Sequence, residues 1–216
     1  MNNKIIILTV TLATVGLVVF SLFSSAERNR TAAINPVANS QNSGMDSHHP
    51  NAGKNTSAAF LNSLAGKQAP AFSLTDRDGK VYSSENLKGK NVVLFFNEGL
   101  MCYPACWNQI AAFGKDERFK SSDTIALSVV VDSKEDWQQA IDQMPELARA
   151  IVVFDSGAAI SSRFGVLSTP SSMHPGSLPG HTFILIDKEG IVRHIFDDPN
   201  MSIHNEQLAL EVSKSK

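Results

Sequence analysis

Residues 92–107 read Val92-Val93-Leu94-Phe95-Phe96-Asn97-Glu98-Gly99-Leu100-Met101-Cys102-Tyr103-Pro104-Ala105-Cys106-Trp107. The first five are β-branched, aromatic or otherwise apolar, which predicts a strand that is buried on both faces. A helical pattern begins near Pro104, where a missing backbone N–H needs no partner, and it runs to about Phe113. This stretch therefore predicts a strand, a loop with two cysteines and a helix, in that order.

Cys102 and Cys106 are the only cysteines of the 216-residue chain. The start of a helix presents unbonded N–H groups and a positive dipole end, and this environment stabilises a thiolate. Helical residues four apart lie about 6 Å apart at Cα, which permits a disulfide. Structural disulfides more often join distant segments. We therefore expect a redox-active or metal-binding pair.

The chain around this stretch alternates between predicted strands and helices. An Asp78-Gly79 turn predicts a hairpin between residues 71–74 and 80–82. Later strands are expected at 124–131, 151–154, 182–187 and 191–196, with helices that begin near Ser133, near Asp155 and at Ser202. This order predicts an α/β fold with a mixed central sheet flanked by helices.

A family resemblance rests on residues 66–74, 78–80, 87–90 and 92–96. They resemble the opening of a redoxin domain, the part of the thioredoxin superfamily that includes AhpC/TSA peroxiredoxins, TlpA/ResA-type thiol-disulfide oxidoreductases and SCO-type copper proteins. The resemblance covers about residues 66–214. It implies a thioredoxin-like fold with an N-terminal β-hairpin.

The function that we expect from the resemblance is thiol-disulfide exchange through Cys102 and Cys106, with His181 as a third catalytic residue and no cofactor besides the disulfide. Copper binding is its first alternative and a peroxidase is its second. The partners would be protein thiols and disulfides or a small peroxide. TlpA-like proteins use CxxC and a cis-proline before a late strand, whereas this chain has CxxxC and His181 there. Gln109 matches their acid or amide three residues after the second cysteine.

A peroxidase is the second possibility. Peroxiredoxins keep their peroxide-reactive cysteine where Cys106 falls, and they need an arginine near it, commonly just before the strand that here begins at Thr182. Pro179-Gly180-His181 occupies that place. Without an arginine there, the thiolate and the transition-state charge lose a main stabiliser. Arg163 could reach in from a predicted helix, but nothing in the sequence shows that it does.

A copper-binding assembly factor is the third possibility. SCO-type proteins carry CxxxC and a distant histidine, and Cys102, Cys106 and His181 match that pattern. Two thiolates and an imidazole suit Cu(I). Tyr103 and Trp107 stand where SCO-type proteins have proline.

For each of the three possible functions we expect His181→Ala to leave the fold intact, because a side chain at the start of a strand can be lost without opening a core cavity.

Other residues near the cysteines have expected roles that are mainly structural. We expect Trp107 and Met101 to pack against or shield the pair. His174 is expected in a surface loop. Asn97 and Glu98 end the strand, where Glu98 either shuttles a proton or is a solvated acid.

The N-terminal region predicts export. Ile5–Phe23 is an apolar run of about bilayer length, so residues 1–26 are a signal peptide or a transmembrane anchor. Residues 27–65 predict a disordered linker, in which Met45, His48 and His49 are weak metal candidates, before a domain at 66–216. We expect a membrane-anchored protein with an extracytoplasmic domain, periplasmic or extracellular, served by a membrane or extracytoplasmic electron donor. Cleavage after Ala26, which would release a secreted form, is the alternative.

The charge pattern excludes one class of partner. Lysine and arginine total 19 against 21 acidic residues, and the chain contains no basic block. No nucleic-acid partner is therefore expected.

Overall fold

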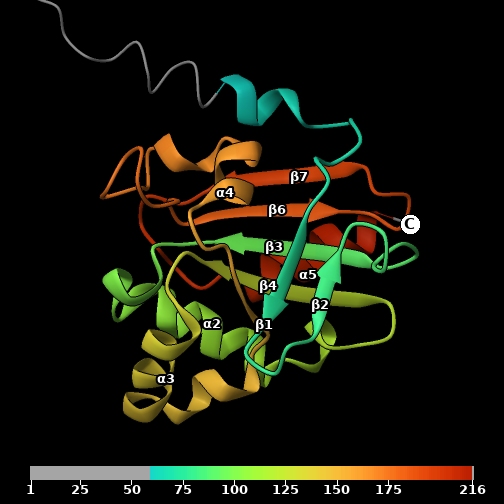
Figure 1. The fold of residues 1–216 in the computed structure, drawn as a ribbon. Coiled ribbons are helices and arrows are strands. Elements are labelled where there is room, and N and C mark those ends of the chain that lie inside the picture. The colour runs from blue at the N-terminus through green and yellow to red at the C-terminus, as the bar shows by residue number, and fades with distance from the viewer. Residues whose placement is uncertain (1–58, 216) are drawn as a thin grey trace, which may run out of the picture. The chain divides into compact units, whose positions relative to one another are not determined.

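The computed structural model describes residues 59–215, which form a central sheet covered by helices (Figure 1). The strands are β1 (Ser73–Asp76), β2 (Val81–Ser83), β3 (Asn91–Phe96), β4 (Thr124–Val130), β5 (Val152–Phe154), β6 (Thr182–Ile186) and β7 (Val192–Asp197). The α-helices are α2 (Ala105–Lys115), α3 (Lys134–Gln143), α4 (Ala159–Phe164) and α5 (Asn205–Lys214). Within residues 59–215 no helix is both long and apolar enough to cross a membrane, and Ile5–Phe23 lies outside this range.

The sheet has seven strands in the order β2-β1-β5-β4-β3-β6-β7. β3, β4 and β5 are parallel to one another, whereas the β1–β2, β1–β5, β3–β6 and β6–β7 pairs are antiparallel. The predicted mixed sheet is therefore confirmed. β3 lies between β4 and β6 and is antiparallel to β6. The loop after β3 and the residue before β6 therefore meet at the same end of these two strands.

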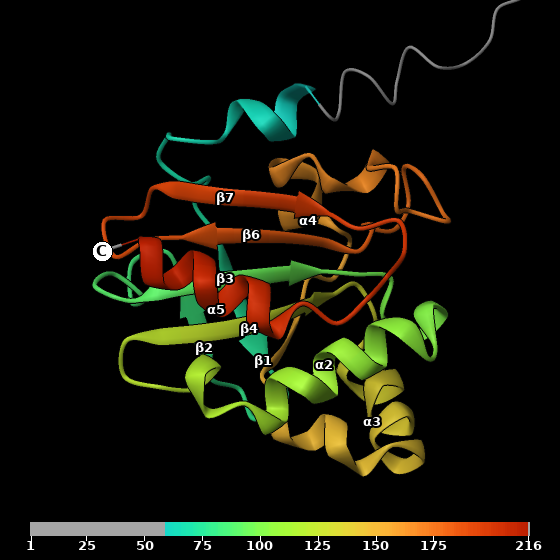
Figure 2. The same cartoon turned by 180° about the vertical axis from the view of Figure 1, so that it is seen from behind.

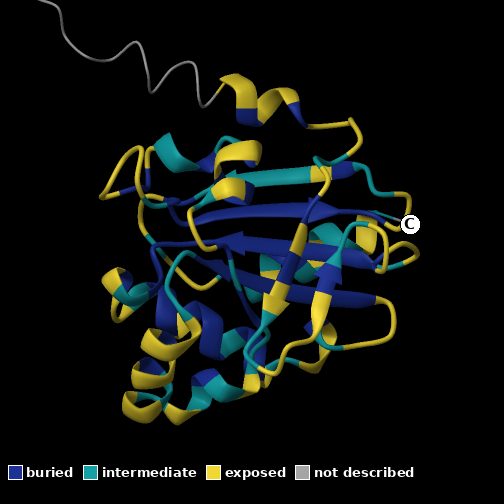
Figure 3. Cartoon of the chain, in the orientation of Figure 1, coloured by how far each residue is buried: buried dark blue, intermediate teal, exposed yellow. Residues whose placement is uncertain are grey.

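Helices cover both faces of the sheet and create two apolar layers. α4 packs its Ile160 and Phe164 on one face, whereas α2, α3 and α5 pack on the other, as the reverse view shows (Figure 2). Every residue of β3, β4 and β6 is buried (Figure 3), which explains why their sequences read as continuous apolar runs.

Local signals in the sequence explain where the helices begin and end. The Ser133 side chain accepts a hydrogen bond from the Asp136 N–H and begins α3, as the capping pattern predicts. The Asp155 carboxylate accepts the N–H groups of Ile160 and Ser161 at the start of α4. Gly165 ends α4 with φ +73°, a left-handed conformation that favours glycine.

Two segments differ from the expected elements. Leu61 and Leu64, inside the range expected for the linker, are 3% and 7% exposed and belong to the core layer on the α4 face. α5 begins at Asn205 rather than Ser202. The backbone of residues 202–204 is not helical because its polar groups bond to Asp198, His181 and Gln109 instead.

Candidate functional site

Cys102 and Cys106 form a disulfide at the N-terminal end of α2. Cys102 ends a 3-10 turn, Gly99–Cys102, and Cys106 is the second residue of α2, with 5.3 Å between the two Cα atoms. The two residues are 2% and 1% exposed. After reduction, the positive end of α2 would stabilise a thiolate on Cys106.

His181 lies directly against this disulfide. Its Nδ1 is 3.4 Å from Cys106 Sγ, and its Nε2 is 3.2 Å from the Ser202 carbonyl oxygen. A carbonyl only accepts hydrogen bonds, so Nε2 carries the proton and Nδ1 presents a lone pair to the sulfur. The two Sγ atoms and Nδ1 all lie within 4.8 Å of one another, so the structure brings together the three predicted site residues.

Burial keeps the His181 imidazole neutral. The residue is 1% exposed, and its ring packs edge-on against Phe95 and Phe183 at centroid distances of 4.6 and 5.2 Å. Loss of solvation lowers the pKa of His181 to about 4, although the Ser202 carbonyl and Asp198 act in the opposite direction. The expectation that His181 can be truncated without opening a core cavity is therefore wrong, because its buried side chain packs against both aromatic rings.

Asp198 and the turn that follows it hold the Ser202 carbonyl in place, and the sequence did not predict a role for these residues. The Asp198 carboxylate accepts the Ser202 N–H at 2.7 Å and the Asn200 N–H at 2.9 Å, and it pairs with His204 Nε2 at 2.7 Å. Met201, with φ +53°, places its Sδ 3.8 Å from Cys102 Sγ. The only local signal was the turn-forming Asp-Pro-Asn sequence, which does not indicate what the turn approaches.

Glu98 is not a solvated acid. It is 1% exposed, and its Oε1 accepts the N–H groups of Met173 and His174 at 2.6 and 3.0 Å. Its Oε2 lies 3.1 Å from His174 Nδ1. Glu98 therefore anchors the loop between α4 and β6. His174 lies in a surface loop as predicted, with a side chain that is 42% exposed.

The other residues near the cysteines have structural contacts. Trp107 is 3% exposed and donates from Nε1 to the Gly99 carbonyl, which confirms its packing role, whereas Met101 is 60% exposed. Asn97 bonds to the backbones of β3 and β4. Gln109 is buried and bonds to the His204 N–H and to Asn205.

Asp198 and Asp197 are among the groups that act on the pKa of His181, and both raise it. Arg163 donates to the Ala71 carbonyl, which lies just before β1. The possibility that Arg163 reaches the cysteines is therefore not borne out, because α4 packs on the face of the sheet opposite α2.

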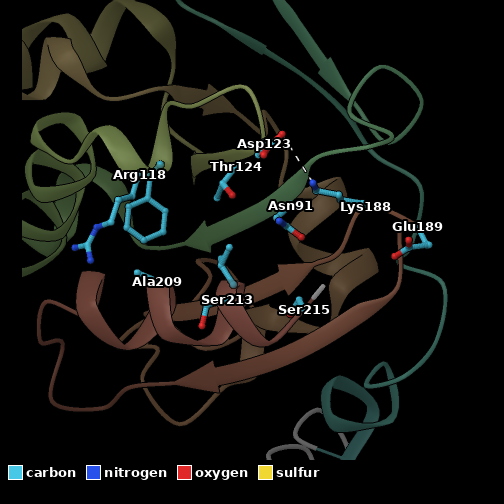
Figure 4. Close-up of a pocket in the computed structure, with 11 residues that line it drawn as sticks. Asn91, Arg118, Asp123, Thr124, Lys188, Glu189, Ala209, Ser213 and Ser215 are labelled. Atoms are coloured by element: carbon cyan, nitrogen blue, oxygen red, sulfur yellow. Dashed lines mark ion pairs between the residues drawn. The ribbon is translucent and has the colours of Figure 1, made fainter.

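A separate cavity of about 570 Å³ lies beside α5, at the end of β3 away from the cysteines (Figure 4). Asn91, the first residue of β3, lines it, and within the described residues its buried Oδ1 has no hydrogen-bond partner. Lys188 and Asp123 form an ion pair of 3.8 Å there. The chemistry of the sulfurs is thus remote from this cavity.

The chain is similar in sequence to peroxiredoxins. The chain is 32% identical over 139 residues to chloroplastic peroxiredoxin Q of Suaeda salsa, a match of 62% of this chain and 59% of that protein. It is 28% identical over 144 residues to peroxiredoxin Bcp of Escherichia coli K12, a match of 66% of this chain and 90% of that protein. The chain thus spans about three fifths of the length of the plant relatives.

The fold is shared with solved structures. Peroxidoxin BcpB of Mycobacterium tuberculosis superposes with a TM-score of 0.58 at 18% identity, and the match covers 70% of this chain and 97% of that one. This likeness establishes the thioredoxin-like fold. The AhpC/TSA family profile matches residues 65–195, a range that contains both cysteines and His181. The chain belongs to the AhpC/TSA family.

Proposed function

We propose that this protein is a thiol peroxidase in which Cys106 reacts with a peroxide and Cys102 then forms the disulfide. The observation that carries the proposal is the 3.4 Å contact between Cys106 Sγ and the lone pair of His181 Nδ1. Peroxiredoxins among the relatives support it. The disulfide pair is the only redox group that the cycle requires.

The reaction begins in the reduced protein with proton transfer from Cys106 to His181 Nδ1. The thiolate that forms beside the ring stabilises the imidazolium, whereas the pKa of about 4 belongs to the oxidised protein, in which Cys106 carries no charge. The thiolate attacks one peroxide oxygen, so that an S–O bond forms and the O–O bond breaks, and the imidazolium returns its proton to the departing oxygen. Water or an alcohol leaves, and Cys106 is a sulfenic acid. The Cys102 thiol then displaces water from that sulfur and closes the disulfide. Peroxide has thereby gained the two electrons that the thiols lost.

Burial favours a small oxidant over a protein disulfide. Cys106 is 1% exposed in α2, so a peroxide can reach it through a smaller opening than a partner chain needs. Reduction requires access to a sulfur, and Cys102 is the better entry because its neighbours Met101 and Tyr103 are 60% and 66% exposed. An external dithiol would attack Cys102, and Cys106 would leave as a thiolate in the first turn of α2. Thiol-disulfide exchange is thus the second half of the same cycle.

Stopped-flow reaction of the reduced chain with hydrogen peroxide tests the proposal. One disulfide should form for each peroxide consumed, and Cys106→Ser should abolish the reaction. Cys102→Ser should stop at a sulfenic acid that dimedone traps. His181→Gln should slow the first step by about 10²–10⁴ and change its pH profile. A reduced chain no more reactive than free cysteine would refute the peroxidase, even if it exchanged disulfides efficiently.

We also propose that this cycle operates outside the cytoplasm, with its reductant at the membrane or beyond it. The apolar run Ile5–Phe23 supports export. Cell fractionation with protease accessibility tests it: the chain should be membrane-bound, or released with an N-terminus at Glu27. A full-length chain protected from protease in the cytosolic fraction would contradict it.

A further inference from the structure

Soft donor atoms converge at the disulfide from separate parts of the chain. Cys102 comes from the end of the 3-10 turn Gly99–Cys102, Cys106 comes from the first turn of α2, and His181 is the residue before β6. Their ligand atoms all lie within 4.8 Å of one another, and all three residues are at least nine-tenths buried. Once the disulfide is reduced, this arrangement offers two thiol sulfurs and one imidazole nitrogen to the same point.

Met201 adds a third sulfur to this group. Its Sδ lies 3.8 Å from Cys102 Sγ, although the two residues are 99 positions apart in the chain. The Met201 backbone has φ +53°, a left-handed conformation that is unfavourable for a non-glycine residue. Its N–H donates to the Asp198 carbonyl at 3.1 Å, which holds the thioether against the cysteines.

We propose that the reduced protein binds one Cu(I) ion through Cys102 Sγ, Cys106 Sγ, His181 Nδ1 and Met201 Sδ. This inference goes beyond the peroxidase and does not depend on it. Three soft sulfur donors select Cu(I), because Zn²⁺ uses thiolate, imidazole and carboxylate ligands but not thioethers. Met201 is therefore the residue that distinguishes a copper site from a zinc site.

The hydrogen bond from His181 Nε2 to the Ser202 carbonyl also suits a metal-binding histidine. A ligating histidine donates its other ring N–H to a carbonyl or carboxylate, which fixes the orientation of the ring. The Ser202 carbonyl already accepts from His181 Nε2 at 3.2 Å, and Asp198 holds Ser202 in turn. Nδ1 is thus oriented towards the sulfurs before any metal arrives.

Metal binding and disulfide formation exclude each other. The bonded sulfurs must first gain two electrons from an external dithiol, which becomes a disulfide. Each cysteine then loses its proton as it binds Cu(I), so two protons are released for each ion. Two buried thiolates without a nearby cation are costly, and the bound ion offsets that cost.

Anaerobic titration of the reduced full-length chain with Cu(I), in competition with a chromophoric Cu(I) chelator, tests the proposal. The chain should bind one ion tightly, and Met201→Leu should weaken binding by about tenfold or more. Met101→Leu is the matched control, because Met101 precedes Cys102 but is 60% exposed. The Cys102→Ser/Cys106→Ser variant measures any binding by Met45, His48 and His49.

X-ray absorption on selenomethionine-labelled protein tests the assignment of Met201 directly. Selenium should scatter in the first shell of copper in the parent and in Met101→Leu, but not in Met201→Leu. Loss of tight binding in the double serine variant would support the site. The proposal fails if the parent binds no stoichiometric Cu(I), if Zn²⁺ displaces Cu(I), or if Met201→Leu retains both the affinity and the selenium signal.

Discussion

Replacing His181 by glutamine should remove a pH dependence from the stability of the oxidised protein. Glutamine is uncharged at every pH, and its side-chain amide can still donate to the Ser202 carbonyl. In the parent, burial lowers the pKa of His181 from 6.5 to about 4 in the folded state. Between these two values the unfolded chain binds more protons than the folded chain.

The sign and size of the effect follow from this difference. The contribution of the neutral His181 side chain to the free energy of unfolding is fully present above pH 6.5 and is lost as the pH falls towards 4. Between pH 7.5 and pH 5 the parent should lose about 2 kcal/mol of unfolding free energy that the His181→Gln variant keeps. With an m-value of about 2 kcal/mol per M, this equals a relative shift of about 1 M in the urea midpoint.

Urea denaturation of the oxidised parent and of the oxidised His181→Gln variant across pH 4.5–7.5 measures this difference in unfolding free energy. The comparison uses the change with pH and not the absolute stability, because glutamine also packs differently against Phe95 and Phe183. Other titrating groups are present in both proteins and cancel. Parallel stability curves for the two proteins would show that His181 is not held neutral by burial, and the reasoning about its tautomer would lose its basis.

Three further substitutions test the packing around the site. His181→Ala opens a cavity beside two aromatic rings and should cost about 2–4 kcal/mol, measured by urea denaturation at pH 7.5. Glu98→Ala removes the acceptor of two backbone N–H groups and should speed amide exchange and proteolysis in residues 172–178; unchanged protection would contradict the anchoring role. Gly99→Ala places a Cβ against the Asp132 carboxylate at φ +58°, so it should cost about 1–3 kcal/mol in thermal unfolding, and an unchanged midpoint would be inconsistent with this packing.

The sequence determined most elements of the domain and the two cysteines that form its disulfide. Continuous apolar runs predicted β3 and β4, and the Ser133 cap predicted the start of α3, because these signals act between neighbouring residues. The position of His181 near the cysteines also followed from the family resemblance. β3 and β6 are adjacent, with Phe96 opposite Thr182, so the residue before β6 lies near the loop after β3.

Only the tertiary structure decided what surrounds this pair. Met201 reaches Cys102 across 99 positions, and Glu98 holds Met173 across 75, so no local periodicity contains either contact. Arg163 has the charge that a peroxidase would use, but α4 packs on the opposite face of the sheet and directs it to Ala71. Charge and residue type are properties of the sequence, whereas the neutral state of His181 comes from the desolvation that packing alone imposes.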